Sequence, residues 1–233
     1  MIPISDTNSD RIRKPLVNYA LIALNIFVFI YYQDWGTNLP FLYSFSAIPH
    51  EIMTGNDVII QGMGATPIPI YGTLITSMFM HGSLSHIAGN MLYLWIFGDN
   101  LENSMGHLRY LMFYLLCGLL AVCGHIFYTQ WMGQDMMMPM LGASGAISGV
   151  LGGYLILYPK NEIRVFAGIL FLRIPAFITL GLWILMQFYN NAYSDSEAGG
   201  GVAYAAHIVG FIAGVLLVKF FTKETQDDKF SLK

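Results

Sequence analysis

Charged residues are scarce in this chain of 233 residues. Lys, Arg, Asp and Glu together make up 11% of it, whereas hydrophobic residues make up 55%. Soluble domains carry about 25% charged residues. The basic residues form no continuous run, so the charge pattern gives no indication of a nucleic-acid partner. Cysteine is also scarce: Cys117 and Cys123 lie six residues apart in one apolar stretch, where no disulfide between them is expected.

This composition predicts an all-α, polytopic membrane protein surrounded by membrane lipids. A helix of about 20 apolar residues crosses a bilayer, and six segments approach or reach that length. They are residues 16–32, 85–96, 108–131, 144–158, 165–188 and 202–221. Pro175 falls within the fifth segment, where we expect a kink. We assign residues 16–221 to one six-helix membrane domain and residues 1–15 and 222–233 to tails.

The basic residues predict the orientation of the chain. The eleven Lys and Arg residues lie before the first segment, after the second, after the fourth, or at the end of the sixth. Arg173 fits this pattern only if it is counted before the fifth segment. Because cytoplasmic connections are enriched in Lys and Arg, both termini are predicted to be cytoplasmic. Arg173 lies inside the predicted fifth span, so either it reaches back to the interface or that span begins later. We expect a multi-pass protein of a prokaryotic cell (inner) membrane.

Two polar residues stand out inside apolar segments. Ser144 begins the fourth segment, and His207 lies within the sixth. Measured from the cytoplasmic ends of these segments, both lie at similar depth below the outer surface. A serine and a histidine that can meet inside a membrane indicate a nucleophile and its general base. The alternative is that Ser144 merely caps its helix, which leaves the ionisable side chain of His207 unexplained.

Glycines follow both residues at helical spacing. Small residues at such positions let two helices approach closely, although the same pattern occurs in ordinary helix packing. The glycines are Gly145, Gly149 and Gly153 after the serine, and Gly210 and Gly214 after the histidine.

The second segment carries further polar residues near its outer end. His86 and Asn90 are four residues apart and therefore share one helix face. Acyl transfer needs such donors, because its tetrahedral intermediate carries an oxyanion that hydrocarbon cannot stabilise. His81 and His86 could instead bind a metal, but neither a third ligand nor a carboxylate base follows them, so we expect no metal. An ordinary satisfied polar contact is the remaining alternative.

Four sequence strings together resemble the rhomboid family of intramembrane serine proteases. They are His81-x4-His86-x3-Asn90, Gly142-Ala143-Ser144-Gly145, Ala206-His207-x2-Gly210-x3-Gly214, and Gly98-Asp99-Asn100-Leu101-Glu102 continued by Gly106-His107-Leu108-Arg109. They occur in the family's order on the expected segments, and the resemblance covers residues 74–218. It implies a six-helix fold in which Ser144 and His207 form a dyad without an acidic residue.

The resemblance also implies roles for the residues around the dyad. His86, Asn90 and the Ser144 amide would form the oxyanion hole, and His81 would be structural, as would the glycines beside the site, Gly142, Gly145 and Gly210. The implied substrates are transmembrane segments of membrane proteins with a small residue before the cut and helix-breaking residues nearby. No cofactor is expected, and the oligomeric state is open. An inactive relative that only binds such segments and a small-solute transporter are the alternatives.

The chain departs from the family pattern in two places. Ser148 stands where some members have an aromatic residue that stacks on the histidine, which leaves the orientation of His207 open. Many members have a Trp-Arg pair in the first outer connection, whereas the connection at residues 33–80 contains Trp35 but no arginine. We expect its aromatic residues to place it in the membrane interface. Residues 194–201 could form a flap over the site or a plain turn, and residues 136–140 could line a substrate channel or serve as packing.

Overall fold

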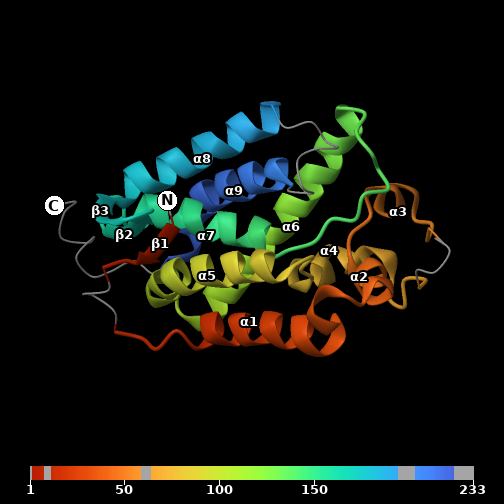
Figure 1. The fold of residues 1–233 in the computed structure, drawn as a ribbon, viewed down its shortest axis with the longest axis horizontal. Coiled ribbons are helices and arrows are strands. Elements are labelled where there is room, and N and C mark those ends of the chain that lie inside the picture. The colour runs from red at the N-terminus through yellow and green to blue at the C-terminus, as the bar shows by residue number, and fades with distance from the viewer. Residues whose placement is uncertain (1, 8–11, 59–63, 194–202, 223–233) are drawn as a thin grey trace.

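The computed structural model describes residues 2–7, 12–58, 64–193 and 203–222, and most of this part of the chain is helical (Figure 1). The helices are α1 (Leu16–Phe27), α2 (Leu39–Phe45), α3 (Pro49–Thr54), α4 (Thr73–Thr76), α5 (Leu84–Met105), α6 (His107–Trp131), α7 (Ser144–Leu157), α8 (Ala176–Tyr193) and α9 (Tyr204–Phe221). A π-helical turn, Val28–Tyr32, continues α1, and short 3₁₀ turns lie at Asp34–Gly36, Ile70–Gly72 and Ser77–Phe79. The strands are β1 (Ile2–Ser5), β2 (Glu162–Ala167) and β3 (Leu170–Pro175).

α7 lies in the middle of the molecule. It packs between α5 and α9, and α6 crosses behind both α7 and α9 (Figure 1). α8 forms one edge, where it contacts α9, and α1 forms the opposite edge against α5. The three strands lie at one end of the helices and α2–α4 at the other. The large buried aromatic side chains Phe97, Tyr110, Phe113, Tyr114 and Tyr154 fill the centre between α5, α6 and α7.

Length and apolar composition identify two of the described helices, α6 and α9, as able to cross a membrane. The segment Leu16–Tyr32 and α7 are apolar but shorter. The predicted count of six spans and the cytoplasmic location of both termini therefore remain predictions.

α5 is longer than the sequence predicted because its polar residues are paired within the protein and do not end the helix. The carboxylate of Glu102 is fully buried and accepts hydrogen bonds from the backbone N–H groups of Val17 (2.9 Å) and Asn18 (2.7 Å). These are free N–H groups of the first turn of α1, so the carboxylate both caps that helix and faces the positive end of its dipole. Asn18 in turn accepts a hydrogen bond from Tyr110 of α6 at 2.8 Å. These contacts attach α1 to the centre.

The predicted fifth span at residues 165–188 is wrong in nearly its first half, residues 165–175. Residues 162–175 form a hairpin of β2 and β3, and α8 begins only after Pro175, which therefore ends a strand and does not kink a helix. The period of two explains the difference: Ile163 and Val165 are buried, whereas Glu162 and Arg164 are exposed. The later start of the helix also removes the need for Arg173 to lie within the membrane.

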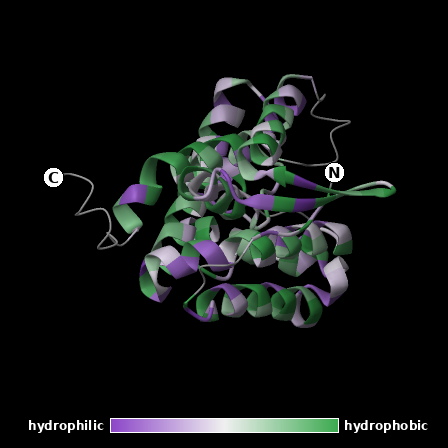
Figure 2. Cartoon of the chain, turned by 90° about the vertical axis from the view of Figure 1, so that its left-hand side faces the viewer, coloured by the Kyte–Doolittle hydropathy of each residue, from purple (hydrophilic) through white to green (hydrophobic). Residues whose placement is uncertain are grey.

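The three-stranded sheet also corrects the all-α prediction, since the chain is mostly helical but not entirely so. β1 pairs antiparallel with β2, placing Ile2 opposite Phe166, so part of the predicted tail at residues 1–15 is a sheet strand. Figure 2 looks at this end of the molecule and shows the hairpin projecting past the helices with a hydrophobic tip. Ile169 and Phe171 form that tip and are exposed.

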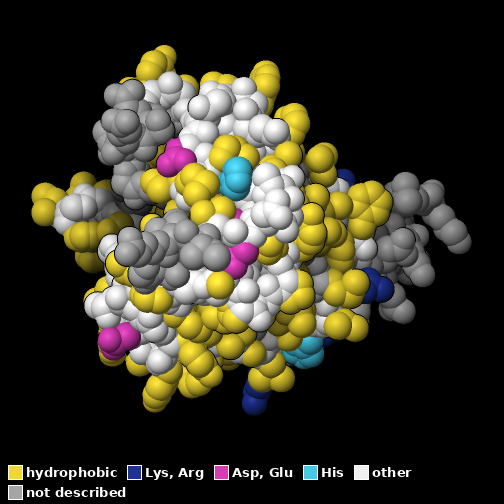
Figure 3. All heavy atoms as spheres, turned by 90° about the vertical axis from the view of Figure 1, so that its right-hand side faces the viewer, with side chains coloured by type: hydrophobic (Ala, Val, Ile, Leu, Met, Phe, Trp, Pro, Cys, Tyr) yellow, Lys and Arg dark blue, Asp and Glu magenta, His cyan; other side chains and the backbone are white. Residues whose placement is uncertain are grey.

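The opposite end of the molecule carries acidic side chains and a histidine at its surface, and basic side chains are visible only at the margin (Figure 3). It contains the connection at residues 33–80, whose described part folds into α2, α3, α4 and 3₁₀ turns, without a long helix. Trp35 and Tyr71 are exposed there, in agreement with aromatic residues suited to an interface. Whether this connection lies in the interface remains a prediction.

Candidate active site

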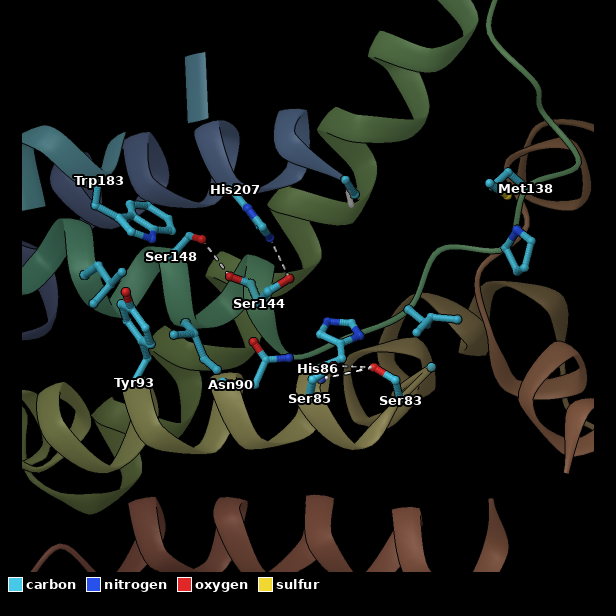
Figure 4. Close-up of a pocket in the computed structure, with 17 residues that line it drawn as sticks. Ser83, Ser85, His86, Asn90, Tyr93, Met138, Ser144, Ser148, Trp183 and His207 are labelled. Atoms are coloured by element: carbon cyan, nitrogen blue, oxygen red, sulfur yellow. Dashed lines mark hydrogen bonds between the residues drawn. The ribbon is translucent and has the colours of Figure 1, made fainter. Parts of the chain in front are cut away.

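Ser144 and His207 are hydrogen-bonded to each other. Ser144 is the first residue of α7, and His207 lies one turn into α9. The His207 Nε2 atom and the Ser144 Oγ atom are 2.8 Å apart (Figure 4). The N-cap position of α7 belongs to Ala143, so the Ser144 hydroxyl contacts the imidazole and does not cap the helix. A hydroxyl bonded to an imidazole nitrogen is the arrangement that activates a serine nucleophile.

The backbones of α7 and α9 touch where these two residues face each other. An added Cβ at Gly210 would lie 2.1 Å from the carbonyl oxygen of Gly145, and one at Gly214 would lie 2.0 Å from that of Gly149. No side chain fits at such distances, so glycine is required on α9 at both positions. The glycine spacing in the sequence thus corresponds to this helix contact, and it fixes the separation of Ser144 and His207.

Gly142 makes a similar close contact just before α7. Its φ of +120° is a conformation that other residues rarely adopt. An added Cβ would lie 2.9 Å from the ring of His86 and 3.7 Å from the Ser144 Oγ. Its backbone N–H donates to the carbonyl of Ser77 at 2.9 Å, which ties the segment to the turn before α5. Glycine at this position therefore lets the His86 ring approach the serine.

His86 and Asn90 lie one turn apart on α5, side by side in Figure 4, and both line the same cavity as Ser144. The Asn90 side chain is buried, and its Nδ2 atom has no hydrogen-bond partner among the described residues. A buried amide donor without a partner is costly, and it would gain a partner if an anionic oxygen entered the cavity.

The cavity between α5, α7, α8 and α9 has a volume of about 700 Å³. Among the described residues that line it, none is Asp, Glu, Lys or Arg. Its polar lining residues are Ser83, Ser85, His86, Asn90, Tyr93, Ser144, Ser148 and His207. The cavity is large enough for several residues of an extended peptide, and its polar groups gather around the serine.

His81 does not face this cavity. Its side chain is fully buried and its ring meets that of His86 edge-on, with the ring centroids 5.1 Å apart. Its backbone is held by Gln33, which donates to the His81 carbonyl at 2.9 Å and accepts from the His81 N–H at 3.0 Å. Among the described residues, no group of three or more His, Cys, Asp and Glu side chains is placed to hold a metal.

Two residues that contact His207 were not predicted from the sequence. Gln187 of α8 accepts a hydrogen bond from the His207 Nδ1 atom at 2.8 Å, and the Trp183 ring lies 6.0 Å from the imidazole at an interplanar angle of 33°. These two contacts orient His207 in place of the aromatic residue that some family members have at position 148. Ser148 itself donates to the Ser144 carbonyl at 2.6 Å. The signal in the sequence was an amide in the middle of an apolar helix, four residues after a tryptophan.

Two further segments were candidates for the site, residues 136–140 and residues 194–201, and the structure describes only the first. Met138 and Pro139 line the cavity, whereas Met140 pairs with Ala47 and packs in a small separate core. The methionine run therefore both lines the site and serves as packing. The predicted flap at residues 194–201 lies outside the described residues.

Comparisons with known proteins find relatives of this chain. A family model for the rhomboid domain matches residues 71–224. The chain is 27% identical over 91% of its length to the mitochondrial Rhomboid protein 1 of Saccharomyces cerevisiae, and 29% identical over 86% to the rhomboid protease GluP of Bacillus subtilis. It is 28% identical over 58% of its length to the human presenilin-associated rhomboid-like protein, which is also mitochondrial.

The chain spans only part of each relative: 55% of the yeast protein, 34% of the bacterial one and 37% of the human one. The relatives come from mitochondria as well as from a bacterium, so they do not support the prediction of a prokaryotic membrane.

Proposed function

The chain belongs to the rhomboid family of integral membrane proteins, and on that premise we propose that it is an intramembrane serine endopeptidase that cleaves transmembrane segments of other proteins. The observation that carries the proposal is the 2.8 Å contact between the His207 Nε2 and the Ser144 Oγ at the wall of a cavity. We further propose that residues 16–221 are a six-span membrane domain, and that residues 1–15, which include β1, and residues 222–233 lie on its cytoplasmic side.

The proposed reaction begins with Ser144. Its Oγ attacks the scissile carbonyl carbon while His207 takes the hydroxyl proton at Nε2. The tetrahedral intermediate carries a negative oxygen. His86 and Asn90 would donate to it from α5, and the free backbone N–H of Ser144 would donate from the first turn of α7. His207 then gives its proton to the leaving amine, and the peptide bond breaks.

Water completes the cycle. It attacks the acyl-enzyme ester with His207 again as general base, which releases the new carboxyl terminus and restores the Ser144 hydroxyl. The hydroxyls of Ser83 and Ser85 on the cavity wall can hold water near the site. A carbonyl within an intact helix is already hydrogen-bonded and enclosed by side chains, so the substrate must unwind locally. This requirement agrees with substrates that contain helix-breaking residues.

Cleavage of a single-span test substrate in liposomes tests the proposal. We expect cleavage by the wild type and none by Ser144→Ala or His207→Ala, with both variants folded as judged by thermal unfolding. Ser148→Ala is the matched control, because it removes a hydroxyl from the same helix and cavity that does not contact His207. A serine-reactive fluorophosphonate should label the wild type and Ser148→Ala but not Ser144→Ala.

Other outcomes would select other functions. A wild type that cuts none of several substrates and resists the fluorophosphonate would indicate a relative that binds transmembrane segments without cutting them. Labelling that survives Ser144→Ala and disappears in Ser148→Ala would show that the nucleophile is the second serine.

A further inference from the structure

We propose that Gln187 on α8 is a positioning residue that fixes the tautomer and the orientation of His207; this inference rests on the proposed function. The imidazole of His207 is bonded at both nitrogens, 2.8 Å from Gln187 Oε1 at Nδ1 and 2.8 Å from Ser144 Oγ at Nε2. In a neutral imidazole one nitrogen donates and the other accepts. The partner at Nδ1 therefore decides which role is left for Nε2.

The second bond of the Gln187 amide defines that partner. Its Nε2 atom donates to the carbonyl oxygen of Trp183, one turn earlier on α8, at 3.3 Å. The amide oxygen is then the atom that faces His207, and it can only accept. His207 must hold its proton on Nδ1, which leaves the Nε2 lone pair facing the Ser144 hydroxyl. This is the tautomer that a general base for the serine requires.

The position of Gln187 on α8 supports a dedicated role. Its side chain is 8% exposed, whereas its neighbours Met186 and Phe188 are 60% and 49% exposed. Of the described residues of α8, Ala176 and Leu180 are also buried, and both lie towards the start of the helix. A glutamine in an apolar helix needs partners inside the protein, and Gln187 finds one by reaching across to the histidine of α9.

Trp183 complements the hydrogen bond from the same face of α8. Its ring lies beside the His207 ring, with centroids 6.0 Å apart, and beside the Phe211 ring, with centroids 6.1 Å apart. The amide thus fixes the edge of the imidazole, while the indole limits its rotation. Because both come from α8, the orientation of the base depends on a helix that contributes neither member of the dyad.

Gln187 is neutral, which sets the size of its contribution. A carboxylate in this place would fix the tautomer and also stabilise the imidazolium that forms during the reaction. Replacing the triad aspartate of a serine protease by asparagine lowers the rate about 10⁴-fold. Loss of one neutral hydrogen bond and of the tautomer preference should instead lower kcat by about tenfold to hundredfold.

The kinetic test compares Gln187→Leu with Asn191→Leu, using the liposome cleavage assay. Asn191 lies one turn after Gln187 and donates to the Tyr128 hydroxyl of α6 at 3.0 Å. Its substitution therefore also removes a hydrogen bond of a side-chain amide on α8, but not one that involves His207. We expect kcat of Gln187→Leu to fall about tenfold to hundredfold with KM within about twofold, and Asn191→Leu to stay within about threefold of the wild type. Gln187→Glu restores the acceptor and should recover most of kcat.

A spectroscopic test reads the tautomer without any reaction. In protein labelled with ¹⁵N-histidine, with His207 assigned from the His207→Ala spectrum, the wild type should carry its proton on Nδ1, and Gln187→Leu should lose that preference. A wild-type His207 protonated on Nε2, or equal loss of kcat in Gln187→Leu and Asn191→Leu, would overturn the inference. Failure of the proposed function looks different: the wild type would neither cleave substrates nor react with the fluorophosphonate, whatever the tautomer.

Discussion

Two of the helices that pack against α9, α7 and α8, contact it in different ways. α7 meets α9 backbone to backbone, so that an added Cβ at Gly214 would lie 2.0 Å from a carbonyl oxygen of α7. α8 meets α9 through side chains that include Trp183 and Gln187, and much of the α8 surface is exposed. An added Cβ at Gly181 of α8 would meet nothing within 4 Å.

This difference separates two requirements of the site. The distance between Ser144 and His207, the proposed nucleophile and base, follows from the backbone contact of α7 with α9, which allows almost no adjustment. The orientation of the base follows from α8, whose side chains can rearrange without disturbing that contact. We therefore expect substitutions within the α7–α9 backbone contact to cost stability and substitutions within the α8–α9 contact to cost activity.

The largest effect is expected from Gly214→Ala. The new methyl group would overlap the Gly149 carbonyl, which belongs to a backbone that cannot move aside. We expect the variant to lose about 2 to 4 kcal/mol of unfolding free energy, and with it the dyad contact. Thermal or denaturant unfolding in detergent micelles measures this, together with fluorophosphonate labelling of Ser144.

Gly181→Ala is the matched control on α8. Because its methyl group has room and alanine favours the helix, the free energy of unfolding should stay unchanged or rise by up to about 1 kcal/mol. Equal destabilisation by the two substitutions would show that α8 is packed as tightly as α7, and the comparison would be wrong.

Gly142→Ala should have the next largest effect, and it should appear in activity. Alanine at a φ of +120° is strained, and its methyl group would press on the His86 ring at 2.9 Å. Since the loss of one oxyanion donor costs 10²–10³ in rate, partial displacement of His86 should lower kcat by about tenfold to hundredfold. A kcat close to that of the wild type would argue against a role for His86 in the reaction. Cleavage kinetics at matched folded fractions measure it.

Much of this architecture was predictable because membrane helices have a strong sequence signal. The predicted limits of α6, α7 and α9 agree with the structure to within two residues, since long apolar runs bounded by glycine, proline and basic residues leave little choice. The hairpin before α8 was missed for the same reason. Its apolar residues formed one run with those of α8, and the exposed Arg164 and Arg173 were attributed to the ends of helices.

The site was predictable in its pair but not in its support. The similar depths of Ser144 and His207 in the membrane could be predicted from the sequence, because each lies a known number of helical residues from a basic residue at the helix end. The contact of Gln187 with His207 could not be predicted, because it depends on which face of α8 points inward. A helix that is apolar on nearly all sides does not indicate its inward face. The spacing of small residues indicated the close contact of α7 with α9, but no spacing indicated the contact of α8 with α9.

Trp183→Ala should have a smaller effect than Gln187→Leu. The indole limits the rotation of His207 but makes no hydrogen bond with it, and the Trp183 side chain is only half-buried. An aromatic contact of this kind is worth about 0.5 to 1.5 kcal/mol, so kcat should fall about threefold to tenfold. Trp183→Phe keeps a ring and should stay near the wild type. A loss larger than that of Gln187→Leu would make the indole the principal support of the imidazole.

The smallest effect is expected at the amino-terminal strand β1. Like α8, this strand is a peripheral element that contacts the central helices through a polar side chain. Asp6, just after β1, accepts hydrogen bonds from Tyr154 at 2.6 Å and from Asn100. Burial raises the pKa of Asp6 from 3.8 to about 7, with the charge of Asp99 adding to the shift. Between about pH 4 and pH 7 the folded chain therefore holds a proton that the unfolded chain has lost.

The free energy of unfolding should accordingly fall as pH rises through this window, by about 1 kcal/mol because the strand is peripheral. In Asp6→Asn this dependence should be weaker. Hydrogen exchange of residues 2–5, followed from pH 5 to pH 8, separates a local effect from a global one. If β1 loses protection while α7 and α9 stay protected, Asp6 resembles Gln187: each is a polar contact that holds an outer element against a centre that is stable without it. Simultaneous loss in β1 and α7 would mean instead that the strand is part of that centre.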